Sequence, residues 1–69
     1  MLLARETPLE MVRRHIRESE ARVQRQRAFV IRLQSLDDDL HAEAESLLAA
    51  LEDALQRHHA HRACLEAEC

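Results

Sequence analysis

The 69-residue sequence contains no glycine, no tryptophan and no tyrosine, and it has a single proline and a single phenylalanine. Without glycine the chain lacks the glycine-rich loop by which many enzymes bind phosphate groups. It also has no convergent Ser/His/Asp set of the kind that nucleophilic catalysis requires. The remaining residues are rich in Ala, Leu, Arg, Glu and Gln, which favour helices. We therefore predict an all-α protein that is not an enzyme and needs no cofactor.

Cysteine and long apolar runs are also scarce. Cys64 and Cys69 are the only cysteines, and a disulfide between them would close a short loop that stabilises little. We expect both to be free thiols. No segment approaches the roughly 18 apolar residues of a membrane span, and the amino-terminal apolar run is too short for a signal peptide. These absences predict a soluble, cytoplasmic protein.

A first helix is predicted over about residues 8–35. Thr7 is a suitable N-cap, Pro8 fits the first helical position, and Glu10 can close a capping box with Thr7. Residues 1–6 would form a flexible leader. Side chains that share one helix face recur at spacings of three and four: Leu9, Val12, Ile16, Ser19, Val23, Gln26, Val30 and Leu33.

A second helix is predicted over about residues 39–66, after a turn at residues 36–39. Asp37, Asp38 and Asp39 repel one another, favour turn and N-cap conformations, and complement the positive end of a following helix. The apolar face of this second helix has the same periodicity: Leu40, Ala44, Leu47, Leu51, Ala54, His58, His61 and Leu65.

Two long helices with a short turn predict an antiparallel two-helix hairpin, formed by residues 1–69 as a single domain. Charge supports this arrangement. Residues 1–36 hold eight arginines and four acidic residues, whereas residues 37–69 hold two arginines and nine acidic residues. The basic first helix would then lie along the acidic second helix. The expected register places Val30 opposite Leu47, and both Ser19 near His58 and Ile16 near His61.

A hairpin of this size has a marginal hydrophobic core, and some apolar side chains fall outside the two predicted seams. Uncovered apolar groups of this kind are typical of partner surfaces, and a second copy is the simplest partner. We predict a homodimeric four-helix bundle; the alternative is that these residues merely flank a monomeric hairpin. The predicted dimer interface comprises Phe29, Ile31, Leu36, Leu48 and Leu55.

Residues 15–26, which read HIRESEARVQRQ, resemble the first helix of a group of small, uncharacterised bacterial helical-hairpin proteins. The resemblance continues through Ala44–Leu48 and Leu55–His58 to Leu65. It implies the hairpin fold and no established activity. The chain departs from the group at Ser19 and Asp38, where glycine is common, and aspartate tolerates a left-handed turn. The matching positions are His15, Glu18, Glu20, Arg22, Val23, Gln26, Leu47, Leu48, His58, Arg62 and Leu65.

The predicted seam becomes polar at the end of the hairpin remote from the turn. Buried polar groups need hydrogen-bond partners, so we expect a Glu–His network across the helices that fixes register and oligomeric state. Helical geometry separates the run QRHHAHRAC: His58 and His61 face inward, whereas His59 and Cys64 diverge to the flanks. The network would comprise Glu18, Ser19, Glu20, Gln26, His58 and His61.

A metal site is an alternative use of the same polar residues, because inward histidines and carboxylates can bind zinc or a di-iron centre. The usual Glu-x-x-His signature of such bundles is missing. The candidate ligands, to which the sequence does not commit, are His58, His61, His15 and Glu20.

Three function classes therefore stay open. The leading hypothesis is a non-enzymatic regulatory or adaptor subunit that acts through homodimerisation and contact with another, unidentified protein. A metal-binding bundle is the alternative, with a divalent transition metal such as zinc. Nucleic-acid binding through the first helix is less favoured, because the second half is acidic, the pI is about 5.9 and there is one aromatic residue. Its arginines would be Arg13, Arg14, Arg17, Arg25 and Arg32.

Overall fold

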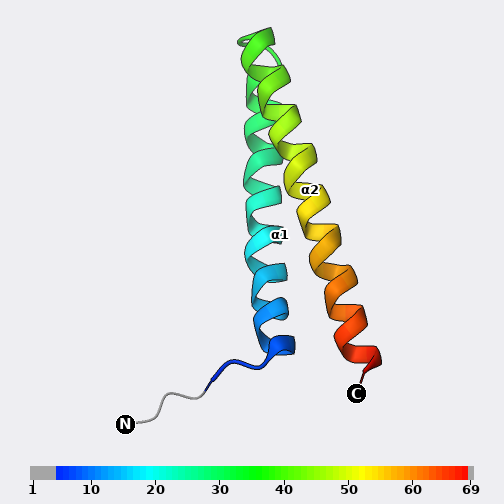
Figure 1. The fold of residues 1–69 in the computed structure, drawn as a ribbon. Helices are drawn as coiled ribbons and strands as arrows, with labels where there is room; N and C mark the ends of the chain where they lie inside the picture. Colours follow the sequence, from blue (N-terminus) through cyan, green and yellow to red (C-terminus); the bar gives the residue numbers. More distant parts are fainter. Residues whose placement is uncertain (1–4, 69) are drawn as a thin grey trace.

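The computed structural model, which describes residues 5–68, is an antiparallel hairpin of two long helices (Figure 1). Helix α1 spans Pro8–Leu33 and helix α2 spans Asp38–Ala67. The molecule is elongated, with principal extents of 50 × 31 × 13 Å. The predicted all-α hairpin is confirmed, and the predicted helix bounds differ from the observed ones by at most two residues. Within residues 5–68, neither helix combines the length and the apolarity needed to cross a bilayer.

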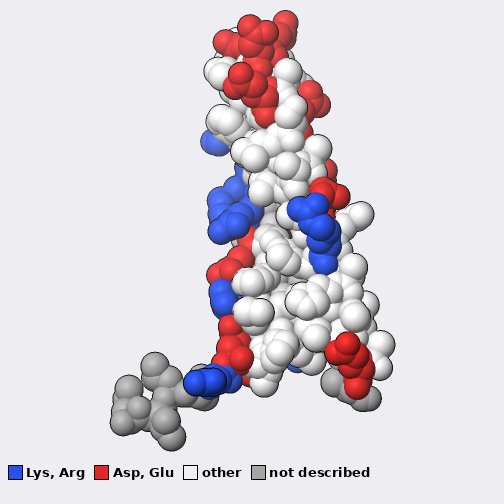
Figure 2. Space-filling view, in the orientation of Figure 1, with Lys and Arg blue, Asp and Glu red and all other residues white. Residues whose placement is uncertain are grey.

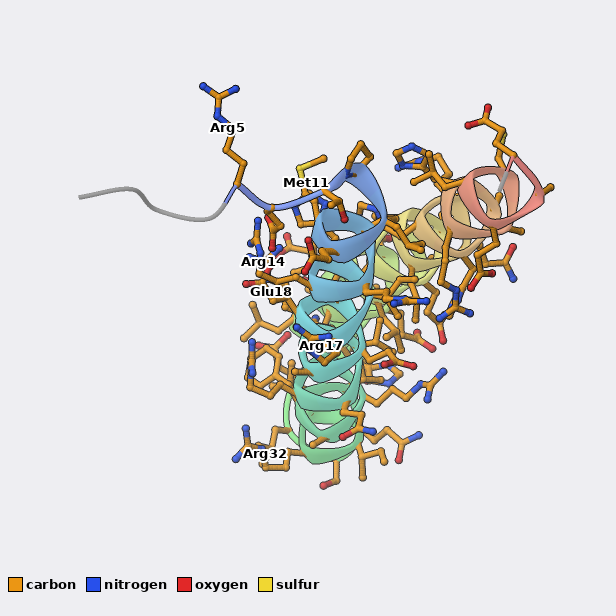
Figure 3. The ribbon with its side chains drawn as sticks, turned by 90° about the horizontal axis from the view of Figure 1, so that it is seen from below. Arg5, Met11, Arg14, Arg17, Glu18 and Arg32 are labelled. Carbon is orange, nitrogen blue, oxygen red and sulfur yellow. The ribbon has the colours of Figure 1, made fainter. Side chains whose placement is uncertain are left out.

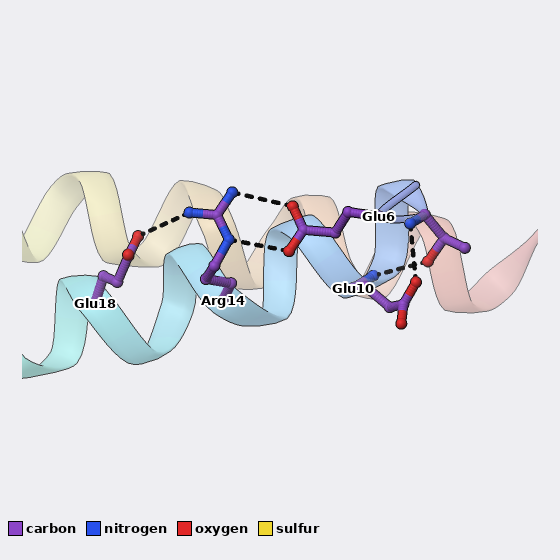
Figure 4. A network of polar contacts seen from close by, with 5 residues as sticks. Glu6, Glu10, Arg14 and Glu18 are labelled. Atoms are coloured by element: carbon purple, nitrogen blue, oxygen red, sulfur yellow. Dashed lines mark hydrogen bonds and ion pairs between the residues drawn. The ribbon is translucent and has the colours of Figure 1, made fainter. Parts of the chain in front are cut away.

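The start of α1 is fixed by the predicted capping box. The Glu10 backbone N–H donates to Thr7 Oγ1 at 3.1 Å, and the Thr7 backbone N–H donates to Glu10 Oε1 at 2.9 Å (Figure 4). Hydrogen bonding to Thr7 lowers the pKa of the Glu10 carboxyl, and the bond from the Thr7 backbone has a larger effect than the interaction with the Thr7 side chain. The capping-box hydrogen bonds satisfy the backbone N–H groups of Thr7 and Glu10, which have no partner within the helix, and thereby stabilise its first turn.

The predicted flexible leader is only partly described, because residues 1–4 lie outside the described residues. Glu6, within the predicted leader, is held by α1: its two carboxylate oxygens accept from Arg14 Nε and Nη2, each at 3.0 Å. Arg14 also contacts Glu18 Oε1 at 3.4 Å (Figure 4). The hydrogen bonds from Arg14 lower the pKa of the Glu6 carboxyl.

The turn occupies residues 34–37, slightly earlier than predicted. Asp37 is the N-cap of α2, and its side chain accepts from the Leu40 backbone N–H at 2.9 Å. Asp38 and Asp39 lie in the first turn of α2, where negative charge is favourable. Among residues 5–68 no residue has a positive φ. Asp38 therefore does not adopt the left-handed conformation that its place in the resemblance suggested.

The core is small and comes mainly from α1. Its buried apolar residues all belong to the seam predicted for the first helix, except for one alanine in α2. Near the turn, Val30, Leu33 and Ala44 form a cluster against which Leu48 packs. Farther from the turn the helices splay apart (Figure 1). The buried residues are Val12, Ile16, Val23, Val30, Leu33 and Ala44.

The face that α2 turns toward α1 differs from the prediction. Leu40 and Leu47, expected in the seam, remain 50% and 51% exposed. Leu48 and Leu55, expected outside the seam, are partly buried, and Leu48 contacts the core. The apolar residues of α2 cover a wide arc, so periodicity defines its inward face poorly. Packing selects the stripe through Leu48, Leu51 and Leu55.

Gln26 reaches from α1 to the backbone of α2. Its Nε2 donates to the backbone oxygen of Ala44 at 2.9 Å. This bond joins α1 directly to the α2 backbone near the turn. It shows that a long polar side chain can reach past the nearest level of the neighbouring helix.

Candidate protein–protein interaction site

The two sides of the hairpin differ in how α1 and α2 are joined. On one side, ion pairs cross between the helices: Arg27 Nη2 lies 2.7 Å from Glu52 Oε2, and Arg13 Nη2 lies 3.8 Å from Glu66 Oε2. We call this the bridged side. Each pair is exposed and contributes little stability by itself, but together they fill the margin of this side with charge.

The opposite side carries two shallow grooves. The turn groove lies near the turn and is lined by Gln26, Phe29, Leu33, Leu40, Glu43, Ala44 and Leu47. The histidine groove lies farther from the turn and is lined by His15, Glu18, Ser19, Arg22 and His58.

Both grooves lie on one side of the hairpin, because the residues that line them follow helical spacings of three, four and seven along each helix. We call this side the open face. Within the described range no ion pair joins α1 to α2 across it. Figure 2 looks onto this face and shows an uncharged band between charged margins, with acidic residues gathered around the turn.

Apolar side chains are concentrated in the turn groove. Phe29, Leu40 and Leu47 remain 43%, 50% and 51% exposed, although all three line the same groove. Phe29 is also approached by the Arg32 guanidinium, whose carbon lies 5.8 Å from the ring centroid. This groove is therefore the part of the open face where a partner would cover the most apolar surface.

The predicted dimer interface overlaps this groove at a single residue, Phe29. Ile31 and Leu36 are more exposed, at 65% and 75%, but they do not line the groove. The other two predicted interface residues, Leu48 and Leu55, are partly buried within the hairpin. Sequence reasoning missed Leu40 and Leu47 because it placed both in the seam between the helices.

The expected Glu–His network does not form among the described residues. Glu20 and His61 are exposed, and Glu18 pairs with Arg14 of its own helix. Ser19 is half-buried and lines the histidine groove, whereas no carboxylate is hydrogen-bonded to His58 within residues 5–68. Of the six predicted residues, Gln26 alone makes a hydrogen bond to the other helix. The rotated face of α2 explains why His61 points outward.

His58 instead faces His15 across the hairpin, with ring centroids 5.3 Å apart and ring planes inclined by 51°. Partial burial lowers the pKa of His58, and the nearby His15 and Arg57 lower it further. The neutral imidazole is thereby favoured at this position. Protonation of His58 would add positive charge to a groove that Glu18 and Arg22 also line.

The geometry does not assemble the candidate metal site. Within residues 5–68 no group of three or more His, Cys, Asp or Glu side chains converges on one point. His15 and His58 are close, but His61 and Glu20 are exposed and belong to no such group. Zinc in proteins usually takes at least three protein ligands, so the described residues do not favour a metal centre.

The two residues of the QRHHAHRAC run that were expected on the flanks differ in burial: His59 is half-buried, whereas Cys64 is exposed. His59 Nδ1 lies 3.3 Å from Arg62 Nη2 on its own helix. Cys64 is a free and exposed thiol. Cys69, the other cysteine, lies outside the described residues.

The arginines proposed for nucleic-acid binding are only partly available. Arg13 pairs with Glu66, and Arg14 pairs with Glu6 and Glu18. Arg14 and Arg32 point away from α2 (Figure 3). Because neighbouring carboxylates offset the charge of two of the five arginines, contact with phosphate groups is weakened.

No known protein family, no curated protein and no solved structure matches this chain. The resemblance to small bacterial helical-hairpin proteins therefore stays an expectation. Any functional conclusion has to come from the surface of the hairpin itself.

Proposed function

We propose that this protein is a homodimerising helical hairpin, without catalytic activity, that works through protein–protein contacts as a regulatory or adaptor subunit. The observation that carries this proposal is the turn groove, in which Phe29, Leu40 and Leu47 are about half exposed side by side. A second copy offers the same groove, so the two surfaces match by symmetry.

The small core gives a physical reason for pairing. Six buried apolar side chains hold two helices together, and chains of this length usually need additional stabilisation. Covering a half-exposed Leu or Phe contributes on the order of 1 kcal/mol. Burial of three such side chains from each copy would favour association, and a monomer would lack this contribution.

Light scattering and sedimentation equilibrium at micromolar concentrations test the proposal. We expect a mass twice that of the 8.0 kDa chain. Leu47→Lys should give a monomer, because it places a charge in the turn groove. The variant should stay helical, since the new ammonium group can pair with Glu43 four residues earlier.

Ile31→Lys is the matched control, because Ile31 is exposed but does not line the groove. It should leave the dimer intact. A wild-type mass of 8.0 kDa up to about 100 μM would overturn the proposal. So would a dimer that Leu47→Lys leaves unchanged while circular dichroism shows the same helix content.

A further inference from the structure

Each helix carries an unpaired charge beside the apolar part of the open face. On α2, Glu43 lines the turn groove. On α1, the guanidinium carbon of Arg32 lies 5.8 Å from the ring centroid of Phe29, which lines the same groove. Neither Glu43 nor Arg32 forms an ion pair within residues 5–68. Both charges therefore lie at the edge of the surface that the proposed homodimer would cover.

Two orientations allow two copies to meet through their open faces with two-fold symmetry. If the axis lies across the helices, the copies are antiparallel, and α1 packs against α1 of the partner subunit and α2 against α2. If the axis runs along the helices, the copies are parallel, and each α1 packs against α2 of the partner subunit. The orientation therefore decides which charges and which grooves meet.

The distribution of charge favours the parallel orientation. Residues 1–36 contain eight arginines and four acidic residues, whereas residues 37–69 contain two arginines and nine acidic residues. In a parallel four-helix bundle, both neighbours of every helix have the opposite net charge, and helices of like charge lie across the diagonal. An antiparallel bundle would place helices of like charge side by side, which disfavours association.

The positions of the two grooves also favour the parallel orientation. An axis along the helices introduces no shift along them, so the turn grooves of the two copies meet, and so do the histidine grooves. In a fully overlapping antiparallel pair, the turn groove would cover the polar histidine groove of the partner subunit. Apolar side chains would then cover polar groups that need water or hydrogen-bond partners.

Contacts within the hairpin define which residues of α1 and α2 lie at the same level. His15 lies beside His58, and Arg27 lies beside Glu52. Counting along both helices from these two contacts places Phe29 level with Leu47, to within about one helical turn. The same count places Arg32 level with Glu43. Because the parallel axis preserves these levels, it brings Leu47 and Glu43 of the partner subunit to Phe29 and Arg32, respectively.

The acidic turns are compatible with this orientation. Asp37, Asp38 and Asp39 belong to the start of α2, and the two copies of α2 lie across the diagonal of the bundle. Their axes would be about 14 Å apart if neighbouring helices pack about 10 Å apart. Arg32 of each copy lies beside α2 of the partner subunit near this end, and offsets part of the negative charge.

We propose that two copies pair through their open faces in parallel, with both turns at the same end. In this dimer Phe29 packs on Leu47 of the partner subunit, and Arg32 binds Glu43 of the partner subunit. The two-fold axis forms each contact twice. This inference rests on the proposed homodimer and adds its orientation and its ion pairs.

A charge-swap experiment tests the ion pairs. Arg32→Glu and Glu43→Arg should each weaken homodimerisation at least about tenfold, because two pairs of like charges then meet across the interface. An equimolar mixture of the two variants should form heterodimers with wild-type affinity, measured by native mass spectrometry over a dilution series. In the heterodimer both pairs unite opposite charges, whereas an ion pair within one chain would give no such recovery.

Arg17→Glu and Glu20→Arg are the matched controls for the charge swap. Both residues are exposed and line neither groove, and each substitution changes the net charge as much as the corresponding test variant. Both controls should keep wild-type affinity, and their mixture should contain only the statistical fraction of heterodimer.

Spin labels at opposite ends of the hairpin test the orientation. Ser35 is exposed in the turn, and Cys64 is exposed near the end of α2. One protein carries Ser35→Cys with Cys64→Ser and Cys69→Ser, and the other keeps Cys64 with Cys69→Ser. In the parallel dimer each label lies level with its copy, so the two labels should be about 20–35 Å apart at both sites.

An antiparallel dimer cannot give two short distances. Asp38, where α2 begins, and Cys64 are separated by about 26 residues, or roughly 40 Å of helix. The components of the two label distances along the helices would therefore sum to about 80 Å for any stagger. A distance beyond about 40 Å at either site, or a mixture of charge variants without heterodimers, would overturn this orientation and leave the proposed function standing. A monomeric wild type would overturn both.

Discussion

The imidazole rings of His15 and His58 face each other from α1 and α2, with ring centroids 5.3 Å apart. His15 lies beside the buried Ile16 of the α1 seam. The other groups that influence His58 are mostly cationic or can become so, namely Arg57, His59 and His61. Glu18 and Arg22 complete the groove from α1. Protonation would therefore add charge where positive charge already gathers.

Stability should depend on pH through His58. Burial and cationic neighbours hold the pKa of folded His58 below its ordinary value of 6.5. The unfolded chain then binds more protons at this site than the folded chain as pH falls, so the free energy of unfolding decreases. The contribution is fully present above pH 6.5 and is lost as pH falls through the lowered pKa. Urea unfolding followed by circular dichroism between pH 7.5 and 5 measures this decrease.

Two variants distinguish the effect of His58 on the pH dependence of stability from that of the exposed His61. His58→Gln should flatten the pH dependence in this window, whereas His61→Gln should leave it in place, because His61 is solvent-exposed. The lowered pKa values of Glu6 and Glu10 act in a more acidic range, below their ordinary value of 4.5. A pH profile that His58→Gln leaves unchanged would refute the assignment.

The capping box at the start of α1 should have a measurable effect on stability. Thr7→Ala removes the oxygen that accepts from the Glu10 N–H and should lower the free energy of unfolding by about 1 kcal/mol. Thr7→Ser keeps that oxygen and should stay within about 0.3 kcal/mol of the wild type. Thermal and urea unfolding at one fixed protein concentration compares the three proteins. Equal losses for both variants would show that the methyl group of Thr7, rather than its hydroxyl, matters.

Two isoleucines on α1 provide a matched test of the core. Ile16 is 4% exposed and Ile31 is 65% exposed. Ile16→Ala should destabilise the hairpin by about 2–4 kcal/mol, since it removes buried methyl groups and leaves a cavity. Ile31→Ala should change stability by less than about 0.5 kcal/mol. Urea unfolding gives both values, and comparable effects at the two sites would contradict the packing described for α1.

The sequence predicted α1 more accurately than α2, for a physical reason. In α1, arginines and glutamates separate Val12, Ile16, Val23 and Val30, so one apolar stripe stands out. In α2, alanines and leucines extend over much of the circumference. Periodicity then allows several inward faces, and packing against α1 decides among them.

Features that depend on adjacent residues could likewise be predicted, whereas features of the candidate site that depend on packing could not. The capping box and the Asp37 cap depend on local hydrogen bonds and could be predicted from adjacent residues. The outward position of His61 and the exposure of Leu47 depend on a rotation of α2 by part of a helical turn. Nothing in the local sequence fixes that rotation, so the Glu–His network was predicted where the structure has a His15–His58 contact.

Gln26 tests whether the hydrogen bond from its side chain to the backbone of α2 matters more than the space that the side chain fills. Its Nε2 donates to the Ala44 oxygen at 2.9 Å, and Gln26 also lines the turn groove. Gln26→Glu cannot donate and places a carboxylate beside that oxygen, so it should lower the free energy of unfolding by about 1–2 kcal/mol at pH 7.

Gln26→Leu should behave differently, although it lacks the same hydrogen bond. The Ala44 oxygen can still accept from the helix backbone, and the leucine would add apolar contact beside Leu33 and Leu47. We expect a free energy of unfolding within about 1 kcal/mol of the wild type, and a tighter dimer by sedimentation equilibrium. If Gln26→Leu lost as much stability as Gln26→Glu, the hydrogen bond itself would be the principal link between α1 and α2 at this level.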